Sequence, residues 1–111
     1  MRSPRAKPRL FIETRALGRV TILALAGALT EDTLAALGRS LSKELARIPP
    51  YLVLDGRYLH VVDAAGTDLL LSAAEHARSS SGRLVAVGFP SIADLDPAAT
   101  VDQAMALMRR G

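Results

Sequence analysis

The sequence predicts an α/β fold, in which a mixed β-sheet of four to five strands packs against amphipathic helices in a single domain. Strand-like and helix-like segments alternate along its 111 residues. Residues 20–25 are apolar on both faces, which favours an interior strand of a covered sheet. Residues 51–87 follow the order strand, helix, strand, which predicts a βαβ unit with parallel strands. A chain of this length buries enough apolar surface to fold as one unit.

The first part of the chain predicts two strands and a helix. Strands are expected at residues 10–14 and 19–25, and the tight turn between them at Gly18 makes the pair antiparallel. Thr30 is the expected N-cap of the helix, with Glu31 and Asp32 in its first turn. Pro49 and Pro50 end the helix. An apolar stripe repeats every three or four residues, at Leu34, Leu37, Leu41, Leu45 and Ile48, and the charged residues off the stripe are Arg39, Lys43, Glu44 and Arg47.

The second part predicts two strands and two further helices. A short strand at residues 51–54 ends in a turn at Asp55, and an apolar pair at residues 61–62 precedes a helix that Asp63 opens and that runs to about Ser79. Small side chains, at Ala73, Ala74 and Ala77 beside Leu70, form its buried face. Residues 84–87 form the next strand, and residues 89–97 are expected to be irregular. Thr100 caps a last helix over residues 101–110.

Composition limits the class of protein and its surroundings. The chain has no cysteine, which excludes disulfides, thiolate metal sites and cysteine nucleophiles, and fits a reducing cytoplasm. The longest apolar stretch, residues 20–29, is too short to cross a bilayer. Residues 1–9 carry four basic groups and no acidic ones, whereas the remaining chain is close to neutral. We therefore expect a mobile basic tail over residues 1–9, a domain over residues 10–111 and no specific nucleic-acid recognition.

Enzyme motifs are missing from the sequence. His60 and His76 have no acidic partners at metal-ligand spacing, and there is no serine-hydrolase elbow, P-loop or dinucleotide fingerprint. Asp55 and Asp63 could act as paired carboxylates or as a phospho-receiver site, but a receiver also needs an acidic cluster and a lysine after a late strand. We therefore expect no catalytic residue, metal or cofactor, with Asp55 in a turn and Asp63 capping a helix.

Five motifs in order resemble the STAS family of anti-sigma factor antagonists. The resemblance covers roughly residues 10–110, and its motifs are Gly27-Ala28-Leu29-Thr30, Val53-Leu54-Asp55, Val61-Val62-Asp63-Ala64-Ala65-Gly66, the strand from Gly82 to Gly88, and the helix start from Thr100 to Met105. In antagonists of this family, a serine directly after the signature aspartate is phosphorylated by a kinase that is itself the anti-sigma factor. The unphosphorylated form binds that kinase.

The sequence departs from the family pattern at that serine. Ala64 stands at the matching position and Ala65 follows, so we expect no phosphorylation there. Thr30 replaces the aspartate of the first motif, and the segment between Val87 and Thr100 looks shortened. One hypothesis is that Ala64 imitates the unphosphorylated serine and makes binding constitutive. A second is that Thr67 supplies the hydroxyl, and a third is that the domain serves another assembly.

The resemblance implies a surface that binds a protein, at the first turn of the second helix. Its predicted residues are Asp63, Ala64, Ala65, Gly66, Thr67 and Asp68. The expected partner is an anti-sigma factor or serine kinase-like protein. The alternatives are an accessory subunit of a lipid-transport ABC system, which would meet the membrane only through its partner, or a stress-signalling scaffold. A small-molecule or nucleotide-binding module and an unrelated enzyme also stay open, and a homodimer would cover any sheet edge left exposed by the shortened segment.

Overall fold

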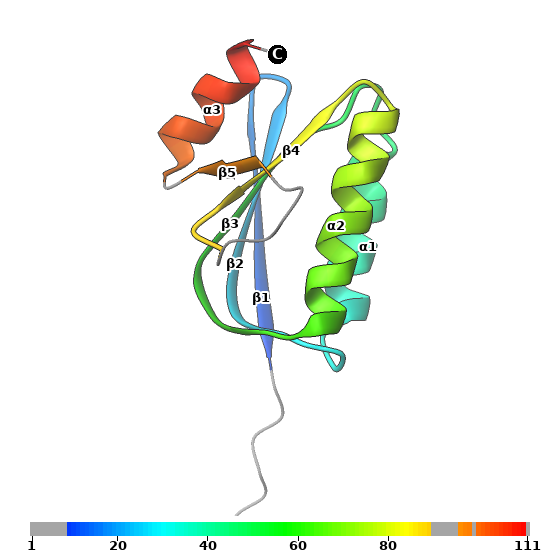
Figure 1. The fold of residues 1–111 in the computed structure, drawn as a ribbon, viewed down its shortest axis with the longest axis vertical. Helices are drawn as coiled ribbons and strands as arrows, with labels where there is room; N and C mark the ends of the chain where they lie inside the picture. Colours follow the sequence, from blue (N-terminus) through cyan, green and yellow to red (C-terminus); the bar gives the residue numbers. More distant parts are fainter. Residues whose placement is uncertain (1–8, 90–95, 99, 111) are drawn as a thin grey trace, which may run out of the picture.

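One five-stranded sheet forms the centre of the molecule (Figure 1). The computed structural model describes residues 9–89, 96–98 and 100–110. Its elements are β1 (Leu10–Leu17), β2 (Val20–Leu29), α1 (Leu34–Leu45), β3 (Tyr51–Val62), α2 (Ala64–Ser79), β4 (Arg83–Val87), β5 (Asp96–Ala98) and α3 (Val101–Arg110). The strands lie in the order β1-β2-β3-β4-β5. β1 and β2 are antiparallel, and every other neighbouring pair is parallel. The predicted mixed sheet is confirmed.

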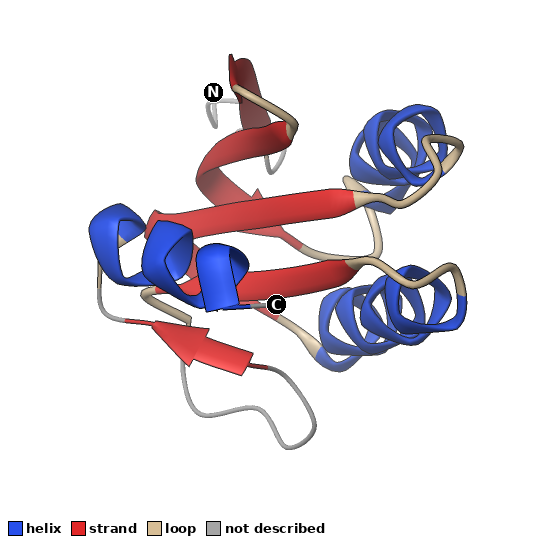
Figure 2. Ribbon diagram, turned by 90° about the horizontal axis from the view of Figure 1, so that it is seen from above, coloured by secondary structure: helices blue, strands red, loops and turns tan. Residues whose placement is uncertain are grey.

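Helices lie on both faces of the sheet, and this gives the protein two hydrophobic clusters (Figure 2). α1 and α2 lie on one face, where their apolar side chains meet Leu23, Leu25 and Leu54 of β2 and β3. α3 lies on the other face, where Ala104 and Met108 pack against valines of β3 and β4. β2 is apolar on both sides because it contributes to both clusters.

α2 lies close to the sheet because its buried face is built from small side chains. Ala73, Ala74 and Ala77 are all buried beside Leu70, as predicted. At the other end of the chain, the Thr100 hydroxyl accepts a hydrogen bond from the Gln103 N–H at 3.1 Å, which confirms the predicted cap of α3. Within the described residues, no helix has the length and apolar character needed to cross a membrane.

α1 begins later than predicted, and Thr30 is not its N-cap. The residue before the helix is Thr33, so Glu31 and Asp32 lie in a turn outside the helix. The turn is stable because the Thr33 hydroxyl donates to the Ala28 carbonyl at 2.8 Å and accepts from the Thr30 N–H at 3.0 Å. These bonds hold the chain in a non-helical conformation for the length of the turn.

The end of α1 also differs from the prediction. The helix stops at Leu45, and Ile48 is 89% exposed instead of extending the buried stripe. Glu44, predicted on the solvent side, is buried. Its carboxylate accepts a hydrogen bond from the Thr21 hydroxyl at 3.1 Å and pairs with Arg47 at 3.1 Å. A neutral donor on β2 and a cation on the next turn together make its burial tolerable.

β3 is one strand of twelve residues, where two short segments and a turn at Asp55 were predicted. The strand continues past Asp55 because two irregularities in its pairing with β2 absorb the extra residues, between Ala24 and Ala26 and between Gly27 and Ala28. The stretch predicted to be irregular, residues 89–97, contains the start of β5, while residues 90–95 lie outside the described residues. Of the expected basic tail, only Arg9 is described.

Candidate functional site

The first turn of α2 lies where two neighbouring parallel strands end. Leu29 and Val62, the last residues of β2 and β3, are register partners. The chain leaves both strands at their carboxyl ends, on the same side of the sheet, and this is where α/β proteins commonly place their binding sites. The Asp63 N–H donates to the Leu29 carbonyl at 3.1 Å, so the start of α2 is tied directly to the end of β2.

Asp63 holds the two loops together. One carboxylate oxygen accepts from the Gly66 N–H at 2.8 Å, which makes Asp63 the N-cap of α2 as predicted. The other oxygen accepts from the Glu31 N–H at 2.9 Å, in the turn that follows β2. The bond from Gly66, followed by that from Glu31, holds the pKa of Asp63 below its ordinary value. The site is therefore fixed before any partner arrives.

Gly66 allows α2 to start this close to β2. A Cβ atom at this position would lie 2.9 Å from both the carbonyl oxygen and the Cγ atom of Leu29. Because real Cβ contacts are longer than this, only glycine permits the observed approach. Gly66 is accordingly buried, and its contribution to the site is to position its neighbours.

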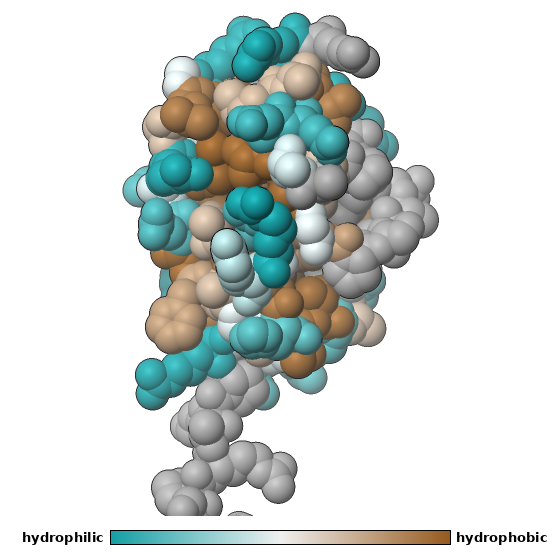
Figure 3. Space-filling model, turned by 90° about the vertical axis from the view of Figure 1, so that its left-hand side faces the viewer, coloured by the Kyte–Doolittle hydropathy of each residue, from teal (hydrophilic) through white to brown (hydrophobic). Residues whose placement is uncertain are grey.

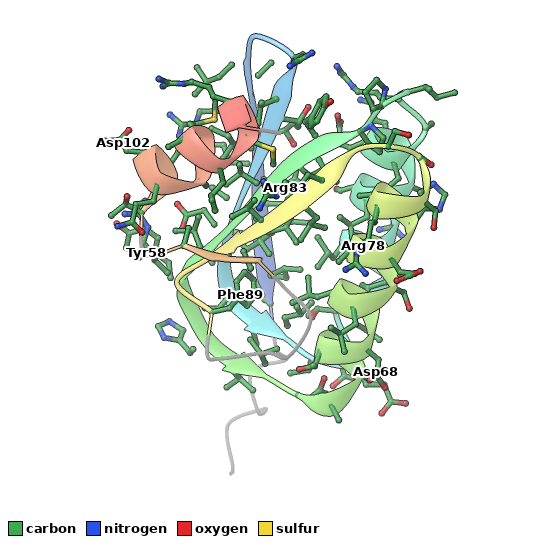
Figure 4. All side chains as sticks on the ribbon, turned by 45° about the horizontal axis from the view of Figure 1, so that its top comes forward. Tyr58, Asp68, Arg78, Arg83, Phe89 and Asp102 are labelled. Atoms are coloured by element: carbon green, nitrogen blue, oxygen red, sulfur yellow. The ribbon has the colours of Figure 1, made fainter. Side chains whose placement is uncertain are left out.

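The remaining predicted site residues reach the surface. Ala64 and Asp68 are exposed, and Asp63, Ala65 and Thr67 are half-buried. Figure 4 shows Asp68 near the start of α2, pointing away from the sheet. The Thr67 N–H donates to the Asp63 carbonyl at 3.0 Å as part of the first helical turn. Five of the six predicted residues therefore reach solvent at the start of α2, and they form the candidate patch.

Two further residues lie beside this patch that the sequence did not assign to it. Glu31 and Asp32 are exposed in the turn after β2, beside the Asp63 carboxylate. The parallel pairing of β2 and β3 was the signal that could have found them, because it brings the residues after both strands together. The patch therefore has an acidic border.

The first motif's Thr30 lies behind this patch and not on it. Its hydroxyl oxygen is buried and has no hydrogen-bond partner in the described part of the chain. Thr33 occupies the N-cap position instead, but its hydroxyl bonds back to Thr30 and Ala28 in the turn and makes no cap hydrogen bond to α1. The prediction that Thr30 is the N-cap of this helix is therefore wrong.

Asp55 and Asp63 are not brought together. Asp55 is buried in the middle of β3, and its carboxylate receives both Arg57 side-chain bonds, from Nε at 2.9 Å and from Nη2 at 2.8 Å. The Arg57 side chain, as the largest influence, holds the pKa of Asp55 below its ordinary value. Asp55 is thus occupied by a structural ion pair. Among the described residues, no group of three or more histidine and acidic side chains could hold a metal ion.

A mixed sheet with two helices on one face, one on the other, and a capped helix starting at the end of parallel strands defines the STAS class of domain. The family model described as "Mlab, STAS domain" matches residues 12–109, and the chain belongs to this family. No curated protein sequence matches the chain.

Solved structures share the fold at low sequence identity. An anti-sigma factor antagonist from Mycobacterium paratuberculosis aligns with a TM-score of 0.80 and 18% identity, over 91% of this chain and 95% of the other. SpoIIAA, an anti-sigma factor antagonist in its unphosphorylated form, aligns with a TM-score of 0.71 and 17% identity, over 89% and 98% of the two chains. A serine-to-glutamate variant of RsbS from Moorella thermoacetica aligns with a TM-score of 0.69 and 17% identity, over 88% of this chain and 97% of the other. These likenesses show the fold.

Proposed function

We propose that the chain is a non-catalytic, cytoplasmic regulator that binds a protein partner through the first turn of α2, in the manner that its resemblance to anti-sigma factor antagonists implies. The observation that supports this most directly is the exposure of Ala64 as the first residue of α2, directly after the Asp63 cap. A methyl group at this position is small and carries no charge. Within the family this is where a phosphate would interrupt binding, so the alanine makes binding constitutive.

The acidic border suggests the chemistry of the partner. Glu31, Asp32 and Asp68 are exposed near the apolar side chain of Ala64 at the start of α2. Charges at the rim of an interface steer association and select partners, while the apolar centre contributes contact. The proposed partner, an anti-sigma factor or serine kinase-like protein, would then carry basic side chains around a small apolar contact.

Substitution at position 64 tests this function. The intact chain is used to capture its partner from the native lysate, and affinities of the purified pair are measured by calorimetry. Ala64→Glu introduces charge at the centre and is expected to weaken binding by at least about tenfold, whereas Ala64→Ser keeps it. Ala35→Glu, at an exposed position of α1, is the matched control and leaves affinity unchanged. Equal binding by the Ala64→Glu variant would rule out the proposed surface.

Phosphate transfer distinguishes constitutive binding from a switch at Thr67. With the partner kinase and ATP, the intact chain is expected to take up no phosphate, while the Ala64→Ser variant takes it up and then releases the partner. Phosphate on the intact chain that Thr67→Val removes would instead identify Thr67 as the acceptor. Thr67 is half-buried one turn along α2, which makes it a poorer acceptor than a residue at position 64.

A second candidate function is that of an accessory subunit of a lipid-transport ABC system. The specific observation that favours it is the matching family model, which is the one described as "Mlab, STAS domain". In this case the same α2 surface would bind a transport ATPase. Capture of a membrane-associated ATPase from detergent-solubilised membranes would support this function, and capture of a small kinase-like protein from the soluble fraction would support the first.

A further inference from the structure

The outer edge of β1 is open in the described part of the chain. β1 ends the strand order, and the only strand paired with it there is β2. It is eight residues long, Leu10–Leu17, and its pairing with β2 runs without a bulge. Such an edge presents a row of unpaired N–H and C=O groups and is a template for another strand.

The hydrogen-bonding phase of β1 fixes which residues offer these groups. The Ala28 N–H donates to the Arg9 carbonyl at 2.9 Å, so Arg9 faces β2. Because N–H and C=O groups alternate in direction along an antiparallel strand, every odd-numbered residue of β1 also faces β2. The even-numbered residues direct their N–H and C=O groups outward, and these are Leu10, Ile12, Thr14 and Ala16. A strand that adds to this edge must satisfy those four residues.

The side chains alternate as well, and one face of β1 is exposed. Leu10 and Ile12 pack on the cluster beneath α1 and α2. The odd-numbered side chains therefore lie on the sheet face that carries α3. All four of them, Phe11, Glu13, Arg15 and Leu17, are exposed. Figure 3 shows hydrophobic and hydrophilic side chains mixed on one side of the molecule.

Phe11 also borders a shallow groove on this face. The groove has a volume of about 400 Å³, and its lining includes the small side chains of Ala24 and Ala26 and the ring of Tyr58, which is 65% exposed. Phe11 itself is 61% exposed and Leu17 is 47% exposed. These two large apolar side chains lie at opposite ends of the same exposed face of β1, on either side of Glu13 and Arg15.

We propose that two copies of this chain pair antiparallel through β1, about a two-fold axis at Thr14. In this register Glu13 lies directly opposite the second copy's Arg15, and Arg15 opposite the second copy's Glu13. Phe11 lies opposite the second copy's Leu17, and Leu17 lies opposite the second copy's Phe11. The strand is therefore complementary to itself, with two opposite-charge pairs inside two apolar pairs, which is what an isologous interface requires.

The neighbouring registers are unfavourable. An axis at Glu13 places Glu13 opposite its own copy and Phe11 opposite Arg15. An axis at Arg15 places Arg15 opposite its own copy and Glu13 opposite Leu17. Like charges directly opposite each other destabilise an antiparallel pair. Among these three registers, only the axis at Thr14 matches every odd-numbered side chain with a compatible one.

The proposed dimer leaves the α2 surface available. Pairing uses the edge of the sheet, whereas α1 and α2 cover its face (Figure 2). Figure 4 shows Tyr58, beside the groove, on the opposite side of the molecule from Asp68. The dimer would therefore present two partner surfaces, and the proposal stands whether or not the proposed function does.

Charge reversal tests the pairing and its register. Sedimentation velocity between about 10 µM and about 1 mM is expected to show a monomer–dimer equilibrium for the intact chain. Glu13→Arg alone, or Arg15→Glu alone, places like charges opposite each other and is expected to weaken the dimer at least about tenfold. The double variant restores both pairs and recovers the dimer. Arg39→Glu, on the exposed side of α1, is the matched control and leaves the equilibrium unchanged.

A cysteine pair gives a second readout that does not depend on charge, because the chain has no cysteine of its own. Oxidation of the Thr14→Cys variant is expected to form a disulfide-linked dimer, since Cα atoms of such opposite residues lie about 5.5 Å apart. The Ala16→Cys variant does not cross-link, because position 16 lies opposite position 12. Circular dichroism confirms that each variant is folded. A monomer at every concentration, single reversals without effect, or equal cross-linking at both positions would overturn the proposal.

Discussion

The Asp63 carboxylate accepts a hydrogen bond from the backbone N–H of Glu31, 32 residues earlier in the chain, at 2.9 Å. Its second oxygen caps α2 through the Gly66 N–H. One side chain thus stabilises a helix end and joins the turn after β2 to the start of α2. The geometry of the candidate site depends on both bonds, and they can be separated by substitution.

Asp63→Asn and Asp63→Ala are expected to lower stability in two steps. Asparagine keeps one oxygen for the cap, where it serves as well as aspartate, but its amide group cannot accept from the Glu31 N–H. Alanine loses both bonds. The urea midpoint should therefore fall in the order wild type, Asp63→Asn, Asp63→Ala, with the slope unchanged. Equal urea midpoints for the asparagine and alanine variants would show that the capping bond to Gly66 does not contribute to stability. An asparagine variant with the wild-type midpoint would show that the bond to Glu31 does not contribute.

The contact between Gly66 and Leu29 gives a second prediction. Gly66→Ala places a methyl group against the Leu29 backbone, and this overpacking is expected to cost about 1–3 kcal/mol of unfolding free energy. Gly38→Ala is the control, because a Cβ atom at Gly38 meets nothing within 4 Å. It should stabilise α1 by about 0.5–1 kcal/mol through helix propensity. Chemical denaturation of both variants checks the pair, and similar gains in both would mean that α2 moves away from β2 without penalty.

Local patterns predicted the parts of the structure that depend on local physics. The spacing of Leu34, Leu37 and Leu41 predicted α1, and an aspartate followed by small residues predicted the cap of α2. The bond from Glu31 to Asp63 could not be read from the sequence, because it depends on the register between β2 and β3. The start of α1 was misplaced for a related reason. Threonine is a favoured N-cap residue at either position, and the bonds from Thr33 back to Ala28 and Thr30 keep the intervening turn out of the helix.

Residue type misled the prediction at Asp55 and Glu44. An aspartate followed by glycine usually marks a turn, and a glutamate between leucines usually faces water. Here each carboxylate is buried with a specific partner, Arg57 for Asp55 and Thr21 with Arg47 for Glu44. A single sequence does not reveal these pairings, because residues of the same types also occur in solvated turns and on exposed helix faces.

Stability is expected to fall in acid, because the pKa values of both Asp55 and Asp63 are lowered in the folded state. In the unfolded chain an aspartate titrates at about 3.9, so both carboxylates contribute their full stabilisation above about pH 5. The contribution is lost as the pH falls through the unfolded value toward the lower folded values. Urea unfolding between about pH 3 and pH 7 should therefore give a smaller loss for Asp63→Asn than for the wild type. An equal loss of stability in acid for the wild type and the Asp63→Asn variant would show that protonation of Asp63 does not cause the loss.

The buried pair of Asp55 and Arg57 gives the last prediction. Arg57 donates to both carboxylate oxygens of Asp55, at 2.9 and 2.8 Å, and Asp55 is only 5% exposed. Arg57→Met removes the cation but keeps an apolar stem, so the buried carboxylate loses its counter-ion and keeps only the hydrogen bond from the backbone N–H of residue 57. This is expected to destabilise the protein more than Asp55→Asn does, because an uncompensated charge costs more than a neutral amide.

The size of the pH dependence identifies the cause of that loss. Arg57→Met removes the largest influence that lowers the pKa of Asp55, while burial still raises this pKa and the backbone N–H of residue 57 and the charge of Arg15 still lower it. The Arg57→Met variant should therefore lose less stability than the wild type as the pH falls, because less of its stability depends on an ionised Asp55. Adding Asp55→Asn to Arg57→Met should restore part of the stability at neutral pH, because no buried charge then remains. An Arg57→Met variant whose urea midpoint falls in acid as much as the wild type's does would mean that water reaches Asp55 and replaces the guanidinium.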